Sequence, residues 1–262
     1  MLSRRGLLVG MTAASALPAS TLAQQTADMG VPANHLKVLS AGSTLYGLRP
    51  ASAEFMRTTG IAVDVATDHG HNIHKAVLDG SADADVVLVP ADWADEIVAA
   101  GRAAKDSLID IGAVRIGAAM RDGAPLPDVT SMAALRRALV AADTVLLTRA
   151  PTGDHLLKVI DRLGLSAAVG AKLQRFDTAT LLNRHLAEAA PATLGFGPAT
   201  EILVWRGKGV AYAGAIPDEV QIVLHYKAAM LTRTAAVDSA RALLTYLATP
   251  DARAHFRASG VE

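Results

Sequence analysis

Ser43 and Thr44 follow an apolar run and precede a helical pattern, which is the arrangement of an anion-binding loop. Residues 36–42 read as a strand that ends in small residues, and residues 45–59 read as a helix. The first N–H groups of a helix lack partners and lie at the positive end of its dipole, so they favour an anion. The alternative is that either hydroxyl only caps the helix. We expect Ser43 and Thr44 to bind a negatively charged ligand.

A second polar segment, residues 67–74, contains three histidines and an asparagine. His69, His71 and His74 have the spacing H-x-H-x-x-H, which invites a zinc interpretation. No cysteine and no carboxylate ligand pattern accompanies them. A solvated loop in which Asn72 caps the next helix is the alternative. We expect no metal and no other cofactor.

Three further positions could contact or transform an anion. Arg149 follows a predicted strand, where its guanidinium could grip a carboxylate with two hydrogen bonds, or could be a surface cation. Thr152 and Gly153 precede a predicted helix over 155–163, so they could cap it and bind an anion there as well. Glu201 could act as a general base, although a carboxylate on a helix face is the commoner situation.

The rest of the chain predicts the elements that position these residues. Gly60 and Gly80 are expected to end helices, and Asp92 to cap one. Predicted strands cover 36–42, 61–66, 85–89, 114–121, 143–148, 192–196, 209–213 and 219–229; predicted helices cover 45–59, 73–79, 93–100, 131–141, 155–163, 178–189, 236–247 and a short segment after Pro250. This alternation predicts an α/β fold with parallel-type sheets flanked by helices.

The same pattern predicts two lobes with a cleft between them. Residues 35–113 form the first lobe, residues 114–222 the second, and residues 223–262 return to the first. Two crossing strands link the lobes, which is the plan of a solute-binding protein. A ligand in such a plan lies in the central cleft, at the carboxyl ends of the strands.

The first 23 residues predict a secretory signal peptide. Arg4 and Arg5 precede a short apolar run, and cleavage is expected near Ala23. The paired arginines resemble a twin-arginine signal. A membrane anchor is the weaker alternative because the apolar run is short, and no other stretch is long enough to span a bilayer. Residues 24–34 read as a flexible lead-in, and we expect a periplasmic protein without stable membrane insertion.

Composition narrows the functional class. Hydrophobic residues make up 51% of the 262 residues but aromatic residues only 4%, which favours helices packed on aliphatic strands over a nucleic-acid platform. Without Arg4 and Arg5 the 25 basic residues fall to 23 against 25 acidic ones, so the formal charge is about −2 and no nucleic-acid partner is expected. The absence of cysteine excludes disulfides and thiolate chemistry. We expect a monomer.

Several segments together resemble the periplasmic molybdate-binding proteins and their less specialised relatives. They are 38–43, the G-x-x-A-D-V-V-L-like segment 80–88, the R-x-G-A-P-x-P-D segment 121–128, and the stretches 155–164 and 244–260. The similarity spans nearly the whole chain after the leader. It implies the two lobes of a type II binding protein and a cleft for an oxyanion or a carboxylate.

The ligand loops depart from the pattern of molybdate receptors. His71 or Asn72 stands where the family has a second hydroxyl, and the third loop is shortened to residues 149–154. The fourth loop, residues 196–201, lacks the family's tyrosine at an obvious position. These departures argue against molybdate itself as the ligand.

The family has an enzymatic branch, the aconitate isomerases, which interconvert trans- and cis-aconitate by moving a proton. An imidazole that titrates near neutral pH suits both halves of that transfer. On this resemblance we expect His71 as the catalytic residue, with His69 and Glu201 as alternatives. The expected substrate-binding residues are Ser43, Thr44, Asn72, Arg149, Thr152 and Gly153. The alternative function is a receptor that delivers a molybdate-like oxyanion or a small carboxylate to an ABC permease.

Overall fold

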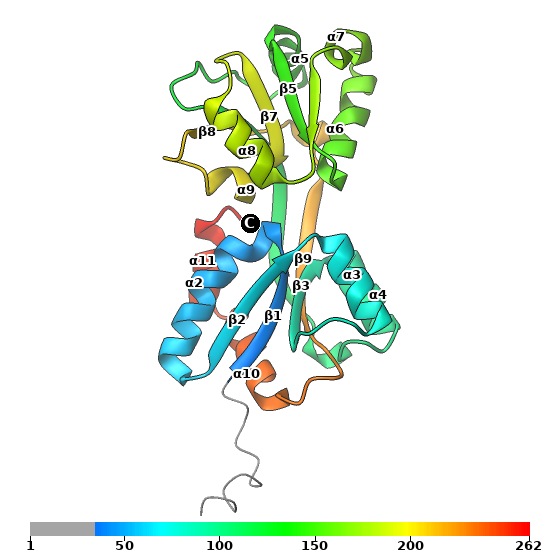
Figure 1. Cartoon of the computed structure of the whole chain (residues 1–262), viewed down its shortest axis with the longest axis vertical. Coiled ribbons are helices and arrows are strands. Elements are labelled where there is room, and N and C mark those ends of the chain that lie inside the picture. The colour runs from blue at the N-terminus through cyan, green and yellow to red at the C-terminus, as the bar shows by residue number, and fades with distance from the viewer. Residues whose placement is uncertain (1–34) are drawn as a thin grey trace, which may run out of the picture. The chain divides into compact units, whose positions relative to one another are not determined.

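The computed structural model describes residues 35–262, so the predicted signal peptide and lead-in lie outside the described residues. Strands and helices alternate as predicted (Figure 1). The strands are β1 (His35–Ala41), β2 (Ala62–Asp68), β3 (Val86–Pro90), β4 (Ile109–Arg121), β5 (Thr144–Thr148), β6 (Leu173–Phe176), β7 (Thr193–Pro198), β8 (Val210–Ala215) and β9 (Val223–Met230). The α-helices are α2 (Gly42–Thr59), α3 (Gly70–Asp79), α4 (Ala91–Ala99), α5 (Met132–Ala141), α6 (Pro151–Arg162), α7 (Ser166–Gly170), α8 (Ala179–Glu188), α9 (Ala199–Leu203), α10 (Val237–Leu247) and α11 (Pro250–Ala258). Two 3-10 turns are η1 (Lys105–Ser107) and η2 (Asp218–Val220).

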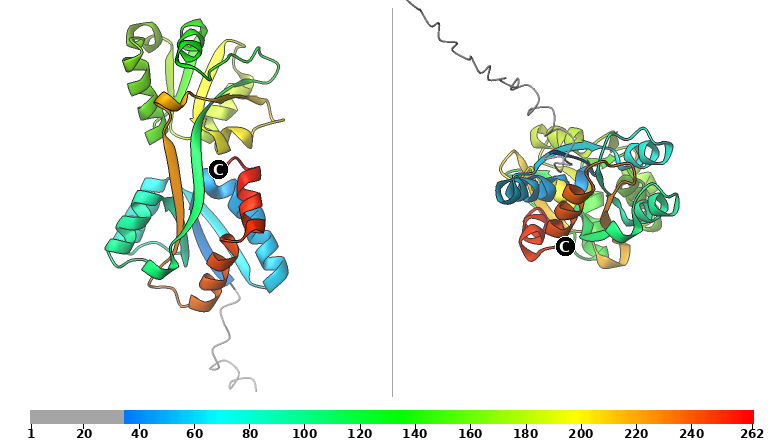
Figure 2. Two further views of the ribbon diagram at one scale, coloured as in Figure 1. Left: turned by 180° about the vertical axis from the view of Figure 1, so that it is seen from behind. Right: turned by 90° about the horizontal axis from the view of Figure 1, so that it is seen from below.

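The strands form one hydrogen-bonded path in the order β2-β1-β3-β9-β4-β7-β5-β6, with β8 also paired to β4. β1 runs parallel to β2 and β3, and β5 runs parallel to β6 and β7. β9 is antiparallel to β3 and β4, and β4 is antiparallel to β7 and β8. The α/β fold is thus confirmed, with mixed sheets because β4 and β9 cross between two parallel groups (Figure 2).

Buried side chains gather in two large clusters, one towards each end of the crossing strands, and in a smaller third cluster that includes Ile202 of α9. The first cluster takes residues from 36–114 and 226–261, including Phe55 and Phe256. The second takes residues from 116–220, including Phe196. None of the helices within residues 35–262 combines the length and apolar character that a membrane span requires.

Several helix ends follow directly from the residue types. The hydroxyls of Ser131, Thr178 and Thr249 each accept a hydrogen bond from the N–H three residues on, so they cap α5, α8 and α11. Gly60 and Gly80 end α2 and α3 with φ angles of 75° and 81°, a region that glycine enters without strain. The predictions for these two glycines are confirmed.

Other local predictions are wrong at helix starts. Asp92 does not cap α4, because that helix begins at Ala91 after Pro90 and has no side-chain cap bond. α6 begins at Pro151, four residues before its predicted start, since proline suits the first helical position. The short elements α7, β6 and α9 were not predicted, because four or five residues are too few to establish a periodicity.

Close packing of α2 on α11 generates a stability prediction at Gly47. A Cβ on Gly47 would lie 2.4 Å from Cδ1 and 2.7 Å from Cα of Phe256, so the helices would have to separate. We expect Gly47→Ala to lower the free energy of unfolding by about 1–3 kcal/mol in urea denaturation. Gly170→Ala is the control, because a Cβ on Gly170 meets nothing within 4 Å. Equal stability of the two variants would contradict this packing.

Candidate functional site

Ser43 and Thr44 lie in the first turn of α2 but have different roles. The N-cap is Ala41, whose side chain makes no cap bond, so the capping alternative for both hydroxyls is wrong. The Thr44 hydroxyl is buried, bonds to Ala41 O at 3.2 Å and lies 2.9 Å from the Ser40 hydroxyl. Thr44 therefore holds the loop together, and Ser43 is the hydroxyl that reaches a different part of the chain.

Ser43 meets Glu201, which lies 158 residues later in the sequence. The Ser43 hydroxyl donates a hydrogen bond to Oε1 of Glu201 at 3.1 Å, joining the start of α2 to α9. A Cβ on Gly42 would lie 3.5 Å from the same oxygen, so the carboxyl also faces the first residue of α2. The structure thus brings together two of the predicted site residues, Ser43 and Glu201, at the predicted anion loop.

The surroundings of Glu201 favour its protonated form. Burial raises the pKa of the Glu201 carboxyl above its ordinary value of 4.5. The hydrogen bond from Ser43 and the nearby charge of His69 act in the opposite direction and lower this pKa, but burial is the larger effect. A carboxyl with a raised pKa can hold or release a proton closer to neutral pH than an exposed one.

Tyr226 and Tyr46, which were not predicted as site residues, also interact with Glu201. Tyr226 on β9 is 5% exposed, and burial raises the pKa of its phenol to about 12. A hydrogen bond with Ser43 lowers the Tyr226 pKa, while Glu201 raises it. Burial and then Glu201 raise the pKa of Tyr46 on α2. In the sequence, Tyr226 is indistinguishable from a core aromatic residue of an alternating strand.

Two of the three predicted histidines, His71 and His74, contact the indole ring of Trp93. His74 stacks on Trp93 at 5.2 Å between ring centroids and lies 2.9 Å from Glu96, while His71 meets Trp93 edge-on at 6.4 Å. His69 is the N-cap residue of α3, without a side-chain cap bond, and it has an electrostatic effect on Glu201. In residues 35–262 no three acidic or histidine side chains come together as a potential metal site.

Asn72 is tied to the end of strand β2. Its side-chain N–H donates to Oδ1 of Asp68 at 3.0 Å, and the His69 N–H donates to the same oxygen at 2.6 Å. The N-cap of α3 is His69, so Asn72 does not cap that helix. Its side chain is exposed and ties the first turn of α3 to the end of β2, so residues 70–72 are helical and not the polar loop that the sequence predicted.

The loop at Arg149 is built around the end of β5. The Arg149 guanidinium is 61% exposed and pairs with Asp177 at 3.1 Å. Thr152 is buried, with its hydroxyl 3.4 Å from that of Thr148. A Cβ on Gly153 would lie only 1.9 Å from Thr148 O, so only glycine permits this approach of α6 to β5. Arg149 is accessible to a ligand, whereas Thr152 and Gly153 hold the backbone of the loop.

Arg175 on β6 secures the same loop and was not predicted. One of its terminal N–H groups donates to Thr148 O at 2.6 Å and to Oδ1 of Asp154 at 2.6 Å. These bonds fix the beginning of α6 relative to β5. No motif distinguishes Arg175 from the other basic residues of the chain.

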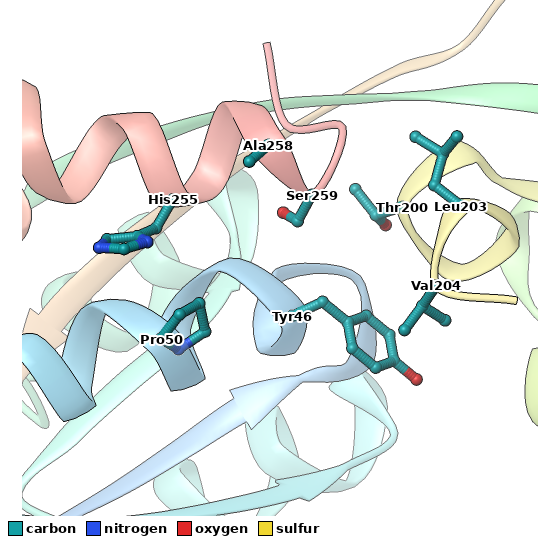
Figure 3. A pocket seen from close by; sticks show the side chains of 8 residues that line it. All are labelled: Tyr46, Pro50, Thr200, Leu203, Val204, His255, Ala258 and Ser259. Carbon is teal, nitrogen blue, oxygen red and sulfur yellow. The ribbon is translucent and has the colours of Figure 1, made fainter. Parts of the chain in front are cut away.

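A cavity of about 420 Å³ lies beside Tyr46 but does not suit a polyanion (Figure 3). It is lined by Tyr46, Pro50, Thr200, Leu203, Val204, His255, Ala258 and Ser259. None of these is lysine or arginine, and half of them are apolar. An anionic ligand therefore fits better at the start of α2, where N–H groups, the Ser43 hydroxyl and His69 are available.

Comparison with known proteins identifies the family. The family model for bacterial extracellular solute-binding proteins matches residues 36–262. The chain belongs to this family. Membership agrees with the two-cluster fold and with an anion loop at the start of α2, and it confirms the family predicted from the sequence motifs.

Solved structures of the family share the fold. The periplasmic molybdate-binding protein of Azotobacter vinelandii matches with a TM-score of 0.72 and 19% identity over 87% of this chain and 98% of that one. The substrate-binding domain of a putative molybdenum ABC transporter from Clostridium difficile matches with a TM-score of 0.68 and 13% identity over the same shares. These matches confirm the type II periplasmic binding-protein fold.

One curated protein with a similar sequence bears the name of an enzyme. A protein of Pseudomonas sp. named aconitate isomerase is 31% identical over 252 residues, which are 94% of this chain and 95% of that protein. The similarity therefore covers the two clusters and the site residues alike.

The raised pKa of Glu201 generates a pH-dependent stability prediction. Between the ordinary glutamate pKa of 4.5 and the raised value, the folded protein keeps a proton that the unfolded chain has lost. Stability therefore falls as pH rises through this range. We expect Glu201→Gln to raise the free energy of unfolding at pH 8 by on the order of 1 kcal/mol, and not at pH 4.

Thermal denaturation of the purified protein from pH 4 to pH 9 measures this difference. Glu188→Gln is the matched control, because Glu188 is exposed at the end of α8. A Glu201→Gln variant whose stability follows the wild-type curve at every pH would show that the Glu201 pKa is not raised.

Proposed function

We propose that the protein is an aconitate isomerase, which interconverts trans- and cis-aconitate by proton transfer. The proposal is supported by the Pseudomonas relative of that name and by the family's anion-binding fold. The substrate is a small tricarboxylate, and no other reactant is needed because isomerisation leaves its composition unchanged.

The observation that carries the proposal is the Ser43–Glu201 hydrogen bond. An ionised carboxylate at the anion loop repels an oxyanion, so it is a poor component for a receptor that only binds one. A carboxyl with a raised pKa is instead suited to take up and release a proton next to a bound anion. A proton-transfer enzyme would use the Glu201 carboxyl, whereas a receptor that only binds an anion would have to overcome its charge.

The reaction moves one double bond and one proton. A base removes a proton from the methylene carbon, and the electron pair of the broken C–H bond forms the new double bond. The former double bond opens, and its terminal carbon takes a proton from an acid. One C–H bond breaks and one forms, so protons balance. His69 and Glu201 are suited to the roles of base and acid, because both can carry a proton and the two groups interact electrostatically.

The three substrate carboxylates need positive or N–H partners. Ser43 and the first N–H groups of α2 bind one carboxylate, and the exposed Arg149 guanidinium binds another after leaving Asp177. We expect Asn72 and His71, in the first turn of α3, to contact the substrate as well. Thr44, Thr152 and Gly153 act indirectly, since their packing sets the backbone of the binding loops.

Lobe movement and location complete the proposal. The first cluster corresponds to a lobe of residues 35–113 and 223–262, and the second to a lobe of residues 114–222. These lobes close on the substrate and open to release the product.

Residues 1–23 direct the chain to the periplasm and are cleaved near Ala23.

A transport receptor is the second candidate, because the solute-binding family itself favours that function. Such a receptor would bind molybdate, tungstate or a small carboxylate and deliver it to an ABC permease. Nanomolar binding of molybdate or tungstate in calorimetry, without isomerase activity, would support the receptor function and contradict the enzyme.

The enzyme function predicts isomerisation without an added cofactor. We expect the purified protein to convert trans-aconitate to cis-aconitate in deuterated water, followed by ¹H NMR. Glu201→Gln should lower kcat by about 10²–10⁴-fold, because an amide cannot take up or release a proton in this range. Glu188→Gln should retain wild-type activity. If the wild type showed no isomer formation and no deuterium exchange, that result would contradict the proposed function.

The positions of the histidines predict unequal effects on turnover. In the described part of the chain, the His71 side chain makes a ring contact with Trp93 and no hydrogen bond or ion pair, whereas the charge of His69 affects Glu201. We expect His69→Ala to lower kcat at least tenfold more than His71→Ala, with similar melting temperatures for both. A larger loss for His71→Ala would assign the base to His71, as first predicted from the sequence.

A further inference from the structure

Asn183 is a polar residue on the buried face of helix α8. The other buried residues of this helix are Ala179, Leu182 and Leu186, which have the spacing of an apolar helix face. Asn183 is 1% exposed, and its neighbours Leu182 and Leu186 belong to the third cluster together with Ile202 of α9. An apolar residue would suit position 183 for packing alone, because a buried amide loses its hydrogen bonds to water.

The amide of Asn183 is satisfied on one side only. Its Nδ2 donates a hydrogen bond to the backbone oxygen of Glu201 at 2.9 Å. This orientation follows from the chemistry, since a carbonyl oxygen accepts and only the amide nitrogen can donate. Within residues 35–262 the Oδ1 atom of Asn183 is buried and has no hydrogen-bond partner. Such an atom costs stability, so packing does not account for an asparagine at this position.

The hydrogen bond from Asn183 takes the place of one that α9 does not make. The helix is five residues long. In a longer α-helix the N–H of Trp205 would bond to the oxygen of Glu201, four residues earlier. Here the Trp205 N–H donates to Ile202 O at 2.9 Å, because the chain tightens at the end of the helix. Asn183 thus supplies the donor for Glu201 O.

This hydrogen bond acts at the residue whose side chain meets α2. The start of α9 is held by the sheet, since Pro198 at the end of β7 pairs with Ile116 of β4. Asn183 holds the main chain at Glu201, and the Oε1 atom of Glu201 lies 3.1 Å from the Ser43 hydroxyl. A shift of α9 by about 1 Å would break this last contact, because hydrogen bonds weaken steeply beyond normal distances.

We propose that Asn183 is a positioning residue, which holds the main chain of Glu201 so that the Glu201 carboxyl faces the start of α2. The inference rests on the proposed function, in which Glu201 transfers a proton, and it adds a residue that acts through Glu201. Asn183 itself is buried and bonds to the main chain of Glu201. Its loss should therefore affect turnover more than substrate binding.

Asn183→Leu tests this role, because leucine has the same branched shape and cannot donate. We expect kcat for trans-aconitate to fall by about 10–10²-fold, with KM within about threefold of the wild type. Asn183→Ala removes the amide without adding methyl groups and should show the same split if the leucine variant does not fold. Wild-type kcat in a folded variant would overturn the inference.

Leu182→Val is the matched control. It disturbs the third cluster from the same face of α8, but the Leu182 side chain cannot hydrogen bond to α9. We expect Leu182→Val to lower the melting temperature and to keep wild-type kcat. A loss of kcat in Leu182→Val as large as that in Asn183→Leu would show that packing, and not the hydrogen bond, sets turnover, and would overturn the inference.

A double variant shows whether Asn183 acts through Glu201. In the Glu201→Gln background, Asn183→Leu should lower the remaining kcat by no more than about twofold, since the group that it positions can no longer transfer a proton. The full loss in both backgrounds would assign Asn183 a general structural role and would overturn the inference.

A second cycle needs no activity. Ser43→Ala removes the hydrogen bond to Glu201 and should lower the melting temperature of the wild type by about 2–4 °C at pH 7. In Asn183→Leu that hydrogen bond is already lost, so Ser43→Ala should lower the melting temperature by less than half as much. Ser43 and Asn183 lie on different helices, and Glu201 is the residue that bonds to both.

The outcomes separate this inference from the proposed function. Isomerisation by the wild type, together with additive effects of Ser43→Ala and Asn183→Leu on melting temperature, would overturn the inference alone. Non-additive effects in a wild type that neither isomerises aconitate nor exchanges deuterium would confirm that Asn183 positions Glu201 and would contradict the proposed function.

Discussion

Strand β4 is the constraint on which the arrangement of the site depends. Its 13 residues pair with β9 through the first half and with β7 and β8 through the second, so one strand belongs to both hydrophobic clusters. β9 returns beside it and carries Tyr226 to the start of α2. The helices α2 and α9 come from different clusters, and their contact through Ser43 and Glu201 is made possible by this shared pair of strands.

The chemistry proposed for the site depends on the Glu201 carboxyl, which lies at the start of α2. N–H groups at the start of α2 suit any small anion, and nothing in them selects a substrate. The Glu201 carboxyl adds a titratable group at the same place, and burial moves its pKa towards neutrality. An anion-binding loop with such a group beside it has the means for proton transfer, and this is the feature that the proposed isomerase function uses.

Much of the fold could be predicted from the sequence, and the physical reason differs between elements. The α/β fold followed from apolar runs alternating with helical periodicity, and Gly60 and Gly80 marked helix ends because their conformation favours glycine. The strand–helix junction that we propose as an anion loop followed from small residues between a strand and a helix. The fold class and the family were therefore predicted correctly.

The contacts between residues of the site could not be predicted from the sequence. Ser43, Glu201 and Tyr226 are brought together from three distant segments, and no local pattern records that the crossing strands do this. The histidine spacing suggested a ligand loop, but the spacing could not reveal that Trp93 occupies the space beside His71 and His74. Burial, which sets the pKa of Glu201, is likewise a property of the folded chain.

Trp93 also gives the protein an optical property. The chain has two tryptophans: Trp93 stacks on His74 in the histidine loop, and Trp205 follows α9, the helix of Glu201. Indole emission depends on the polarity and charge of its immediate surroundings, and a protonated imidazole quenches it. The tryptophan fluorescence of this protein therefore originates beside α3 and beside α9, and it reports on the surroundings of both helices without any added label.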